Sequence, residues 1–363
     1  MISPALLALV RCPDCRGELL DDTASLVCRG CGRQRVKGPG YLDLRPSTTF
    51  AEQTKYLDDA LHADHRHETV SPPLLQAGVR QRMLQQFLQP RPGDLIVDLG
   101  CGSGRSLVWN RESGADMVGI DVAPYFALQA IEGGDLVLGD LRRLPFADRT
   151  FSKGYALDVF EHLSRESLGD VLGEIGRVMR PGGHLFAYSH VRKNSALAGG
   201  LRGVNALARG LERIGLVDLQ QERLRKSDHL NPLADIPDLE RTVHAAGFRI
   251  ARIRYYTPLV GAFVENVLMR VAERGLGRWT ARNTPERDAL AAQARLARSA
   301  AKARLARHGA LYRLLQAVTT LMMTDVWMFG AVRTGPFFVL LERTADVPAA
   351  KRTGHDVLEP ARS

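Results

Sequence analysis

Residues 100–104, Gly-Cys-Gly-Ser-Gly, have the types and spacing of a loop that binds a nucleotide-like ligand. They follow the apolar run 95–97 and the acid Asp98, and a helix-forming stretch comes after them. Glycines let a ligand lie against bare backbone amides at the positive end of a helix. The sixth position is Arg105, where a dinucleotide loop has a third glycine. The pattern predicts a nucleoside-bearing cofactor other than a dinucleotide.

Two further acids follow the next two apolar runs. Asp121 ends the run 117–120, at the offset of about 20 residues where an acid binds ribose hydroxyls. Asp140 ends the run 136–139 and leads into Leu144-Pro145-Phe146. Each acid alone is weak evidence, but their order along the chain adds independent support for one cofactor site.

With these motifs the chain resembles the class I S-adenosylmethionine-dependent methyltransferases, particularly the group that includes ubiquinone and menaquinone methylases. The resemblance lies in IVDLGCGSGR, VGIDVAP, GDLRRLPFADRTF, YALDVFEHL and VMRPGGHLFAYSH, within about residues 90–190. It implies that Asp98 and the loop hold the methionine part of the cofactor, Asp121 the ribose, and Asp140 with Leu141 the adenine. The full implied set is Asp98, Gly100, Cys101, Gly102, Gly104, Asp121, Val122, Asp140 and Leu141. The alternatives are a nicotinamide-binding domain with a degenerate loop, or a fold that has lost its ligand.

Four of the five cysteines form two pairs, Cys12 with Cys15 and Cys28 with Cys31. Two-residue spacing lets both thiolates of a tight turn face one tetrahedral cation, so the pairs predict zinc. Four protein ligands leave no position for water, and the zinc is therefore expected to be structural. A pair of disulfides is the alternative, and it suits secreted proteins. Cys101, inside the glycine loop, is expected to pack as a small apolar side chain.

The residues around the cysteines extend this interpretation. The segments 5–11 and 40–44 look like the zinc-ribbon proteins that activate methyltransferases, and like the front end of bacterial 23S rRNA guanine methyltransferases. This second resemblance covers about the first 45 residues. It raises an RNA substrate as a hypothesis.

Candidate catalytic residues follow the fourth and fifth expected strands. Methyl transfer is a direct displacement, so alignment and exclusion of water matter most, and a base is needed only if the acceptor loses a proton. Asp158 and His162 are the candidate catalytic pair, with Glu161 between them and His190 next. The competing interpretation of His162 is a helix-start residue bonded within the fold.

Apolar runs that alternate with helical patterns predict an α/β fold with a parallel sheet and helices on both faces. The resemblance implies that this is the Rossmann-like seven-stranded sheet of class I methyltransferases. Strands are expected near 94–98, 116–120, 135–139, 153–158, 184–189, 248–255 and 336–342, and Arg180-Pro181-Gly182-Gly183 as a turn. The resemblance implies that the last two strands form an antiparallel hairpin. The expected domains are a zinc ribbon (1–45), a linker and helical lid (46–90), the core (91–255, with an insertion at 191–232), a basic and apolar helical insertion (256–334), the last core strand (335–345) and a disordered tail (346–363). His62, His65 and His67 are expected to be solvated or to line the lid.

The composition is that of a globular protein, with 363 residues, 45% hydrophobic and 25% charged. The net charge of +9 is concentrated at 270–313, where eleven Lys or Arg stand against three Asp or Glu. This segment is either a solvated helix or a phosphate-binding patch for RNA or anionic lipid. Leu290, Leu296 and Leu305 do not share a helical face, which disfavours an amphipathic anchor there. No apolar run is long enough for a membrane span, and without a leader pattern cytoplasmic residence is expected.

Three functions remain open from the sequence. The first is methylation of a small, hydrophobic or lipid-like acceptor, favoured by the core resemblance and by the apolar blocks 258–271 and 311–329. The second is methylation of rRNA or tRNA bases, favoured by the ribbon and the basic segment but weakened by an aromatic content of 6%. The third is a non-catalytic scaffold that binds the cofactor. The expected partners are a small-molecule acceptor, with RNA and peripheral membrane contact as further options.

Overall fold

The computed structural model describes residues 2–22, 25–47, 70–193, 197–217, 229–272, 309–333 and 335–344. The three histidines His62, His65 and His67, the tail 346–363 and most of the basic segment lie outside these ranges. Within the described ranges, no helix is long and apolar enough to cross a membrane.

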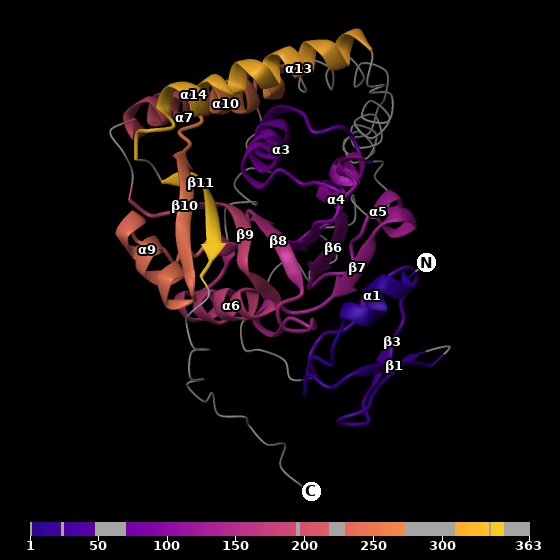
Figure 1. Ribbon diagram of the computed structural model, residues 1–363. Helices are drawn as coiled ribbons and strands as arrows, with labels where there is room; N and C mark the ends of the chain where they lie inside the picture. The colour runs from indigo at the N-terminus through magenta and orange to yellow at the C-terminus, as the bar shows by residue number, and fades with distance from the viewer. Residues whose placement is uncertain are drawn as a thin grey trace, which may run out of the picture.

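The core is a mixed eight-stranded sheet with the order β10-β11-β9-β8-β5-β6-β7-β4 (Figure 1). Its strands are β4 (Leu42–Asp43), β5 (Leu95–Leu99), β6 (Asp116–Asp121), β7 (Asp135–Leu138), β8 (Phe151–Leu157), β9 (Met179–His190), β10 (Phe248–Tyr255) and β11 (Pro336–Arg343). Strands β4 to β9 pair in parallel, and β11 runs antiparallel to both of its neighbours. The predicted α/β class with a terminal antiparallel hairpin is confirmed.

Helices cover both faces of this sheet. One face carries α6 (Arg165–Val178) and α9 (Ile236–Ala245), whose buried side chains pack on Val97 and Leu99 of β5. The opposite face carries α3 (Leu75–Leu88), with α4 (Arg105–Asn110) and α5 (Leu128–Gly133) beside it. Because side chains alternate along a strand, Ile96 and Asp98 face the α3 side, whereas Val97 and Leu99 face the α6 side.

Strand β9 differs from its prediction at the start. The segment Arg180–Gly183 was expected to be a turn, but β9 already begins at Met179, directly after α6 ends at Val178. Phe151 pairs with Met179 and Lys153 pairs with His184, so the register shifts between these pairs and Arg180–Gly183 have no partner in the β8–β9 ladder. The bulge accommodates the turn-forming residues within the strand.

The N-terminal segment is joined to the core and does not form a free unit. Helix α1 (Pro4–Leu9) is capped by Ser3, and the strands β1 (Leu19–Asp22), β2 (Ser25–Cys28) and β3 (Gln34–Val36) form an antiparallel sheet. Strand β4 then pairs with β7 and adds an eighth strand to the expected seven. Leu6, Leu42 and Leu44 are fully buried in the same apolar cluster as Val97.

A helical layer, here called the cap, lies over the α3 side. It contains α7 (Ala198–Arg213), α10 (Leu259–Phe263), the π-helix η5 (Val264–Met269), α13 (Ala310–Met322) and α14 (Thr324–Phe329). Figure 1 shows α13 as the outermost bar of this layer, with α3 beneath it. Short 3-10 helices occur at η2 (Arg111–Ser113), η3 (Leu141–Arg143) and η4 (Phe160–His162).

Candidate functional site

The glycine loop closes the carboxyl end of β5 by binding the neighbouring strand. The amides of Gly100 and Cys101 donate to the carbonyl of Ile120 at 2.9 and 3.0 Å, which fixes the loop on β6. Gly100, Gly102 and Gly104 have φ angles of +71°, +55° and +74°. A Cβ at Gly100 would lie 2.6 Å from Val159, and one at Gly104 2.6 Å from Ala130. At Gly102 no atom of the described residues lies within 4 Å of such a Cβ, so among these residues this is the point where the loop is open.

Asp98 is a buried carboxylate beside this loop. Its side chain is 3% exposed, and within the described structure its Oδ2 has no hydrogen-bond partner. Burial raises the pKa of Asp98 to about 8, against the opposing effect of the Tyr155 hydroxyl next to it in the register. A cationic group that reached this oxygen would restore the charged carboxylate. The site therefore fits the amino group of an amino-acid ligand.

Asp121, at the end of β6, braces the glycine loop. Its Oδ2 accepts from the amide of Gly102 at 2.8 Å, and its Oδ1 accepts from the amide of Ala123 at 3.0 Å. Burial raises the pKa of Asp121, while these backbone donors hold it down. Val122 lies between Asp121 and Ala123, half-buried at the same edge. The structure brings Asp121 and the loop together as expected.

Asp140 lies after β7 at the same edge of the sheet, but it is paired within the fold. Its carboxylate accepts from the Nε of Arg142 at 2.9 Å and from an Nη at 2.7 Å. It also caps η3 by accepting from the Arg142 amide at 2.9 Å. Leu141 is half-buried beside it. Arg142 was not among the predicted site residues, although its position two residues from Asp140 is a signal of this pairing.

The candidate catalytic residues gather at the carboxyl ends of β8 and β9. Asp158 has a φ of +57° and lies 3.0 Å from an Nη of Arg80 on α3. The guanidinium of Arg80 also lies 4.9 Å from the centre of the Tyr188 ring. The pKa of Asp158 is raised, mainly by burial. The positive charge of Arg80 opposes this shift, and the negative charge of Glu161 adds to it. Sequence reasoning missed Arg80, since no local pattern links a residue on α3 to this edge.

Glu161 is the most deeply buried acid of this group, with no exposed surface. One carboxylate oxygen accepts from the hydroxyl of Ser189 at 3.0 Å, and the other lies 3.3 Å from Nδ1 of His190. Burial opposes the charge of Glu161, but the nearby His190, together with a backbone amide and His162, outweighs burial and lowers the pKa of Glu161. Glu161 and His190 thus form a carboxylate–imidazole pair.

His162 ends the helix η4, and its ring meets that of His229 edge to face, with centroids 4.7 Å apart. The potential ligand atoms of Glu161, His162 and His229 lie within 4.8 Å of one another. The amides of Leu230 and Asn231 donate to the Glu161 carbonyl at 2.8 and 3.0 Å, which holds the His229 segment over η4. His229 was not predicted, because it lies in an insertion without a pattern of its own.

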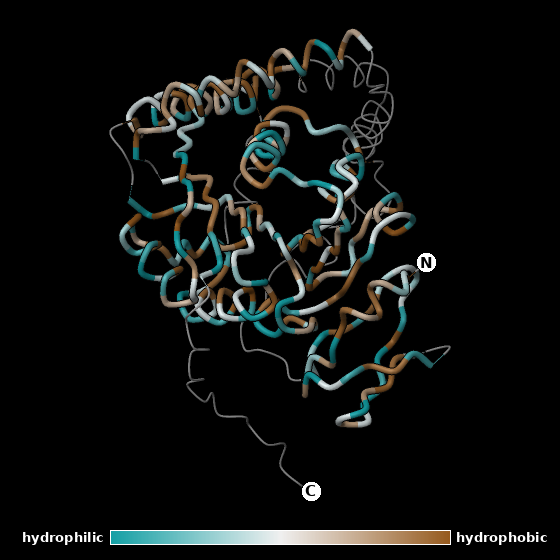
Figure 2. Tube along the Cα trace, in the orientation of Figure 1, coloured by the Kyte–Doolittle hydropathy of each residue, from teal (hydrophilic) through white to brown (hydrophobic). Residues whose placement is uncertain are grey.

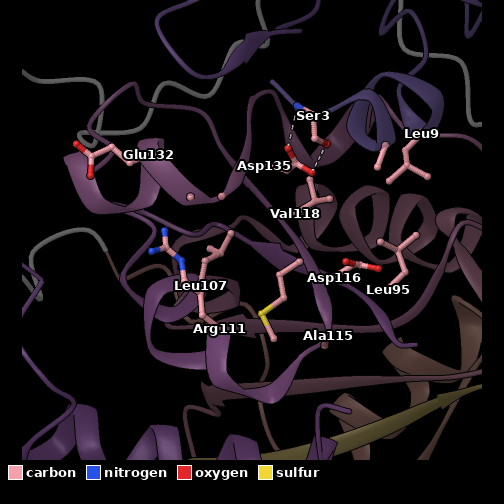
Figure 3. Close-up of a pocket in the computed structure, with 14 residues that line it drawn as sticks. Ser3, Leu9, Leu95, Leu107, Arg111, Ala115, Asp116, Val118, Glu132 and Asp135 are labelled. Atoms are coloured by element: carbon pink, nitrogen blue, oxygen red, sulfur yellow. Dashed lines mark hydrogen bonds between the residues drawn. The ribbon is translucent and has the colours of Figure 1, made fainter. Parts of the chain in front are cut away.

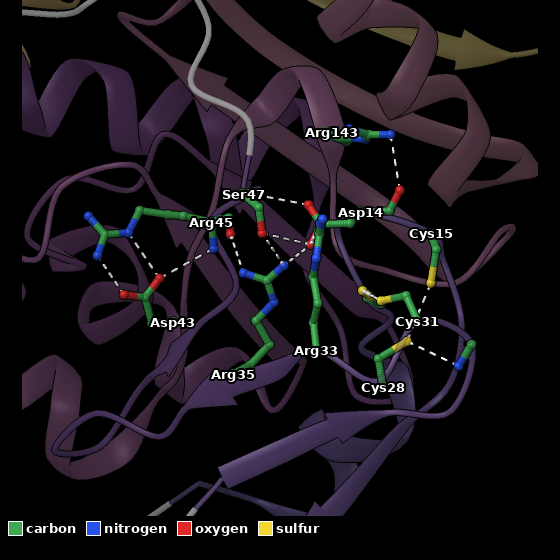
Figure 4. A network of polar contacts seen from close by, with 12 residues as sticks. Asp14, Cys15, Cys28, Cys31, Arg33, Arg35, Asp43, Arg45, Ser47 and Arg143 are labelled. Atoms are coloured by element: carbon green, nitrogen blue, oxygen red, sulfur yellow. Dashed lines mark hydrogen bonds and ion pairs between the residues drawn. The ribbon is translucent and has the colours of Figure 1, made fainter. Parts of the chain in front are cut away.

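The four paired cysteines meet in the N-terminal segment (Figure 4). Sγ of Cys12 lies 3.7 Å from that of Cys31, and Sγ of Cys15 lies 3.3 Å from that of Cys28. Four sulfurs bound to one zinc at about 2.3 Å would stand about 3.8 Å apart, so the cluster fits a tetrahedral cation. No disulfide joins any two of these four cysteines, which is against the two-disulfide alternative.

The cysteine cluster is fastened to the core by charged groups. Asp14, between Cys12 and Cys15, forms ion pairs with Arg33 and Arg35, and its carbonyl accepts from Arg143 at 3.1 Å (Figure 4). Arg16 pairs with Glu174 of α6 at 2.6 Å. The ribbon therefore has fixed polar contacts with the core.

Cys101 does not join this cluster. Its sulfur packs between Gly119 and the cluster around Leu107, where a Cβ on Gly119 would lie 2.9 Å from it. Burial raises the pKa of the Cys101 thiol well above its usual value, which suits a packed side chain and not a nucleophile.

A separate cavity of about 460 Å³ lies at the opposite edge of the sheet (Figure 3). Its walls include Leu95, Asp116 and Asp135, the first residues of β5, β6 and β7, and Ser3 beside α1. Ser3 Oγ donates to Asp135 at 2.7 Å, so part of this wall is a contact between the ribbon and the core. Because it lies at the amino ends of the strands, this cavity is not part of the glycine-loop site.

Two family models match the chain. Residues 97–187 match a methyltransferase domain, and residues 3–34 match a Trm112p-like protein. These segments carry the two resemblances inferred from the sequence, and the matches confirm both. They also support both expected cofactors, S-adenosylmethionine through the domain type and structural zinc through the ribbon.

Curated relatives share only part of their length with this chain. It is 30% identical over 145 residues to 24-methylenesterol C-methyltransferase 2 of Oryza sativa, covering 37% of the chain and 39% of the relative. It is 31% identical over 131 residues to probable tRNA methyltransferase 9B of Bos taurus, covering 35% and 28%. It is 39% identical over 110 residues to demethylmenaquinone methyltransferase of Corynebacterium kroppenstedtii, covering 29% and 45%. The chain thus spans less than half the length of each, and their names include sterol, tRNA and quinone-precursor acceptors.

Proposed function

Since the chain carries a class I methyltransferase domain joined to a Trm112-like zinc ribbon, we propose that it transfers a methyl group from S-adenosylmethionine to a small hydrophobic or lipid-like acceptor. The observation that carries the cofactor part is the buried Asp98 carboxylate, with an unbonded oxygen, beside the open backbone at Gly102. Together these supply a carboxyl group that the ammonium group of the cofactor would ionise, and space among the described residues for the amino-acid end of the cofactor.

The other cofactor contacts follow from the same edge of the sheet. Asp121 holds the amide of Gly102 and is assigned the ribose hydroxyls. Asp140 and Leu141 are assigned the adenine, with Arg142 fixing the direction of the Asp140 carboxylate. Val122, Gly100, Cys101 and Gly104 complete the assigned wall.

When bound, S-adenosylmethionine supplies an electrophilic methyl group on a sulfonium. The residues of the chain must align the acceptor and, if the acceptor carries a proton, remove it. We assign proton removal to the group of Asp158, Glu161, His162 and His190, in which the buried Glu161 orients the His190 imidazole. A carboxylate beside Nδ1 keeps the second ring nitrogen available as a base.

A hydrophobic acceptor is supported by the side chains that enclose this group. Tyr188, Tyr256 and Phe338 form a buried aromatic cluster, with ring centroids 4.9–6.2 Å apart. Val264 of η5 and Met322 of α13 are buried in the same apolar cluster. Among the described residues, the cap therefore brings apolar side chains to the acceptor side.

A tRNA or rRNA acceptor is the second candidate, and it has one specific observation in its favour. The match to a Trm112p-like protein at residues 3–34 occurs beside a domain that is also related to a probable tRNA methyltransferase. We place the activity in the cytoplasm, because four cysteines that cluster as a zinc site without disulfides suit a reducing compartment.

The test is incubation of purified protein with radiolabelled S-adenosylmethionine and whole-cell extract, followed by separation into organic, aqueous and RNA fractions. Label in the organic fraction is expected. Label confined to RNA would replace the first proposal by the second. Cofactor binding by calorimetry without any labelled fraction would indicate the non-catalytic scaffold.

A further inference from the structure

The outer surface of the cap carries a row of large apolar side chains. Leu314, Leu321 and Met328 are 60%, 54% and 70% exposed, and Trp327 beside Met328 is 62% exposed. Isolated exposed apolar side chains are ordinary, but a contiguous set on one element marks an interaction surface. These four residues define the cap face.

Helical spacing places this row on one side of the cap. Leu314, Leu321 and Met328 are seven residues apart, which is close to two turns, and α14 follows α13 after the single residue Met323. The opposite side of α13 is occupied, since Thr319 accepts from the Leu75 amide at 2.8 Å and Met322 is buried against α3. The cap face therefore points away from the core, in agreement with the outermost position of α13 (Figures 1 and 2).

The neighbouring elements of the cap continue the apolar surface. Phe263, Leu268 and Val271, at α10 and η5, are 38–50% exposed, and Leu207 and Ile214, at α7, are 48% and 68% exposed. Helix α7 contacts both α10 and η5, and α10 also contacts α13 and α14.

The exposed charges of the cap are positive. Within the described parts of the cap, five arginines are exposed, and the three acids are not. The arginines are Arg202, Arg209, Arg213, Arg313 and Arg333. Asp325 is fully buried, where it accepts from the amides of Val260 and Gly261 at 3.0 and 2.9 Å.

We propose that the cap face binds the surface of a membrane that contains anionic lipids. Exposed leucine, methionine and tryptophan side chains can enter the boundary between headgroups and acyl chains, and arginines beside them can bind lipid phosphates. A second copy of the chain fits this face less well, because it would bring the arginines of two caps together. An RNA partner would use the charge but leave the apolar row against water.

This inference deepens the proposed function and rests on it, because membrane binding would bring the enzyme to a lipid-like acceptor. Binding itself requires neither cofactor nor catalysis. A vesicle-binding measurement can therefore fail or succeed independently of the methyl-transfer assay.

The test is co-sedimentation of the full chain with vesicles of phosphatidylcholine, with and without phosphatidylglycerol. We expect binding to the mixed vesicles that falls as salt rises, and weaker binding to phosphatidylcholine alone. The double variant Leu314→Glu with Leu321→Glu is expected to bind about a hundredfold less tightly, since each of the two lost leucine contacts is worth about one factor of ten. Val36→Glu is the matched control, because Val36 is 67% exposed but lies on β3 of the ribbon.

Thermal unfolding of all three proteins checks that the variants remain folded. The inference is overturned if the unaltered chain binds no vesicles, or if the double variant and Val36→Glu lose binding equally. It is also overturned if the double variant abolishes only self-association in light scattering, or only the binding of a labelled tRNA probe.

Discussion

The guanidinium of Arg80 lies 3.0 Å from the carboxylate of Asp158 and so joins α3 to the end of β8. Both side chains are partly exposed, at 26% and 37%, on the acceptor side of the candidate site. Asp158 is held in the left-handed region at φ +57°, a conformation that is uncommon for residues other than glycine, and this ion pair fixes its side chain there. Such strain at a functional edge is typical of residues that position chemistry.

Replacing Arg80 by methionine is expected to raise the pKa of Asp158, because the nearby cation that stabilises the carboxylate is lost. If Asp158 must be charged for methyl transfer, the acidic limb of the pH–rate profile then moves to higher pH. Labelled product formed in extract, measured across pH, gives this profile. Arg80→Lys retains the charge and should leave the limb nearer its original position. A profile that is the same in all three proteins would show that Asp158 does not act through its charge.

Asp98→Asn is expected to weaken cofactor binding and, relative to the natural chain, to increase stability as pH rises. The folded pKa of Asp98 is about 8, well above the value of about 3.9 in an unfolded chain, so the folded protein holds a proton that the unfolded chain releases. The contribution of Asp98 to stability is therefore present at low pH and is lost as pH rises toward 8. Relative to the natural chain, the variant should gain stability with pH by up to about 1.4 kcal/mol per unit.

Cofactor affinity is expected to change with pH in the opposite direction to the stability that Asp98 contributes. Binding of an ammonium group favours the charged carboxylate, so affinity of the natural chain for S-adenosylhomocysteine should rise between about pH 6 and 8. Asp98→Asn should bind weakly and show little of this rise. Calorimetry at several pH values checks both, and equal affinities for the two proteins would remove Asp98 from the site.

Gly102→Ala tests whether the open space at the loop belongs to the cofactor. The left-handed backbone makes alanine cost about 1–2 kcal/mol of stability, but the added Cβ meets nothing within 4 Å. We expect a cofactor affinity at least about tenfold lower, the effect of roughly 1.4 kcal/mol of lost contact. Gly182→Ala is the matched control, because Gly182 also has a positive φ of +74° and open surroundings but lies in β9 near the opposite edge. Equal loss of affinity in both variants would assign the effect to backbone strain alone.

The elements around the glycine loop were predictable because their signals are local. The loop, Asp98 and Asp121 lie at strand ends, and parallel pairing brings strand ends to one edge without further information. The bond from the Gly102 amide to Asp121 follows from this neighbour relation between β5 and β6.

The remaining parts depend on packing that no local pattern reports. Arg80 reaches Asp158 only because α3 crosses the sheet at a particular angle, and His229 reaches His162 only because an insertion folds back on η4. Strand β4 consists of two residues, too few for alternation to be seen in the sequence, and it forms because β7 offers an open edge. The catalytic roles of Asp158 and His162 stay predictions, because the structure shows which residues lie next to them and not what they do.

Cys15→Ser is expected to remove most of the bound zinc and to loosen the ribbon from the core, since one ligand of four is lost. Elemental analysis of purified protein should give about one zinc per natural chain and far less in the variant. Loss of zinc also removes the support for Asp14, whose carbonyl binds Arg143, so the melting temperature should fall and the contacts of β4 with β7 should open first in hydrogen exchange. Cys101→Ser is the control, because Cys101 packs at Gly119 away from the cluster and should leave the zinc content unchanged. A Cys15→Ser protein with full zinc and unchanged exchange at β4 would contradict a four-thiolate site that stabilises the joined ribbon and core.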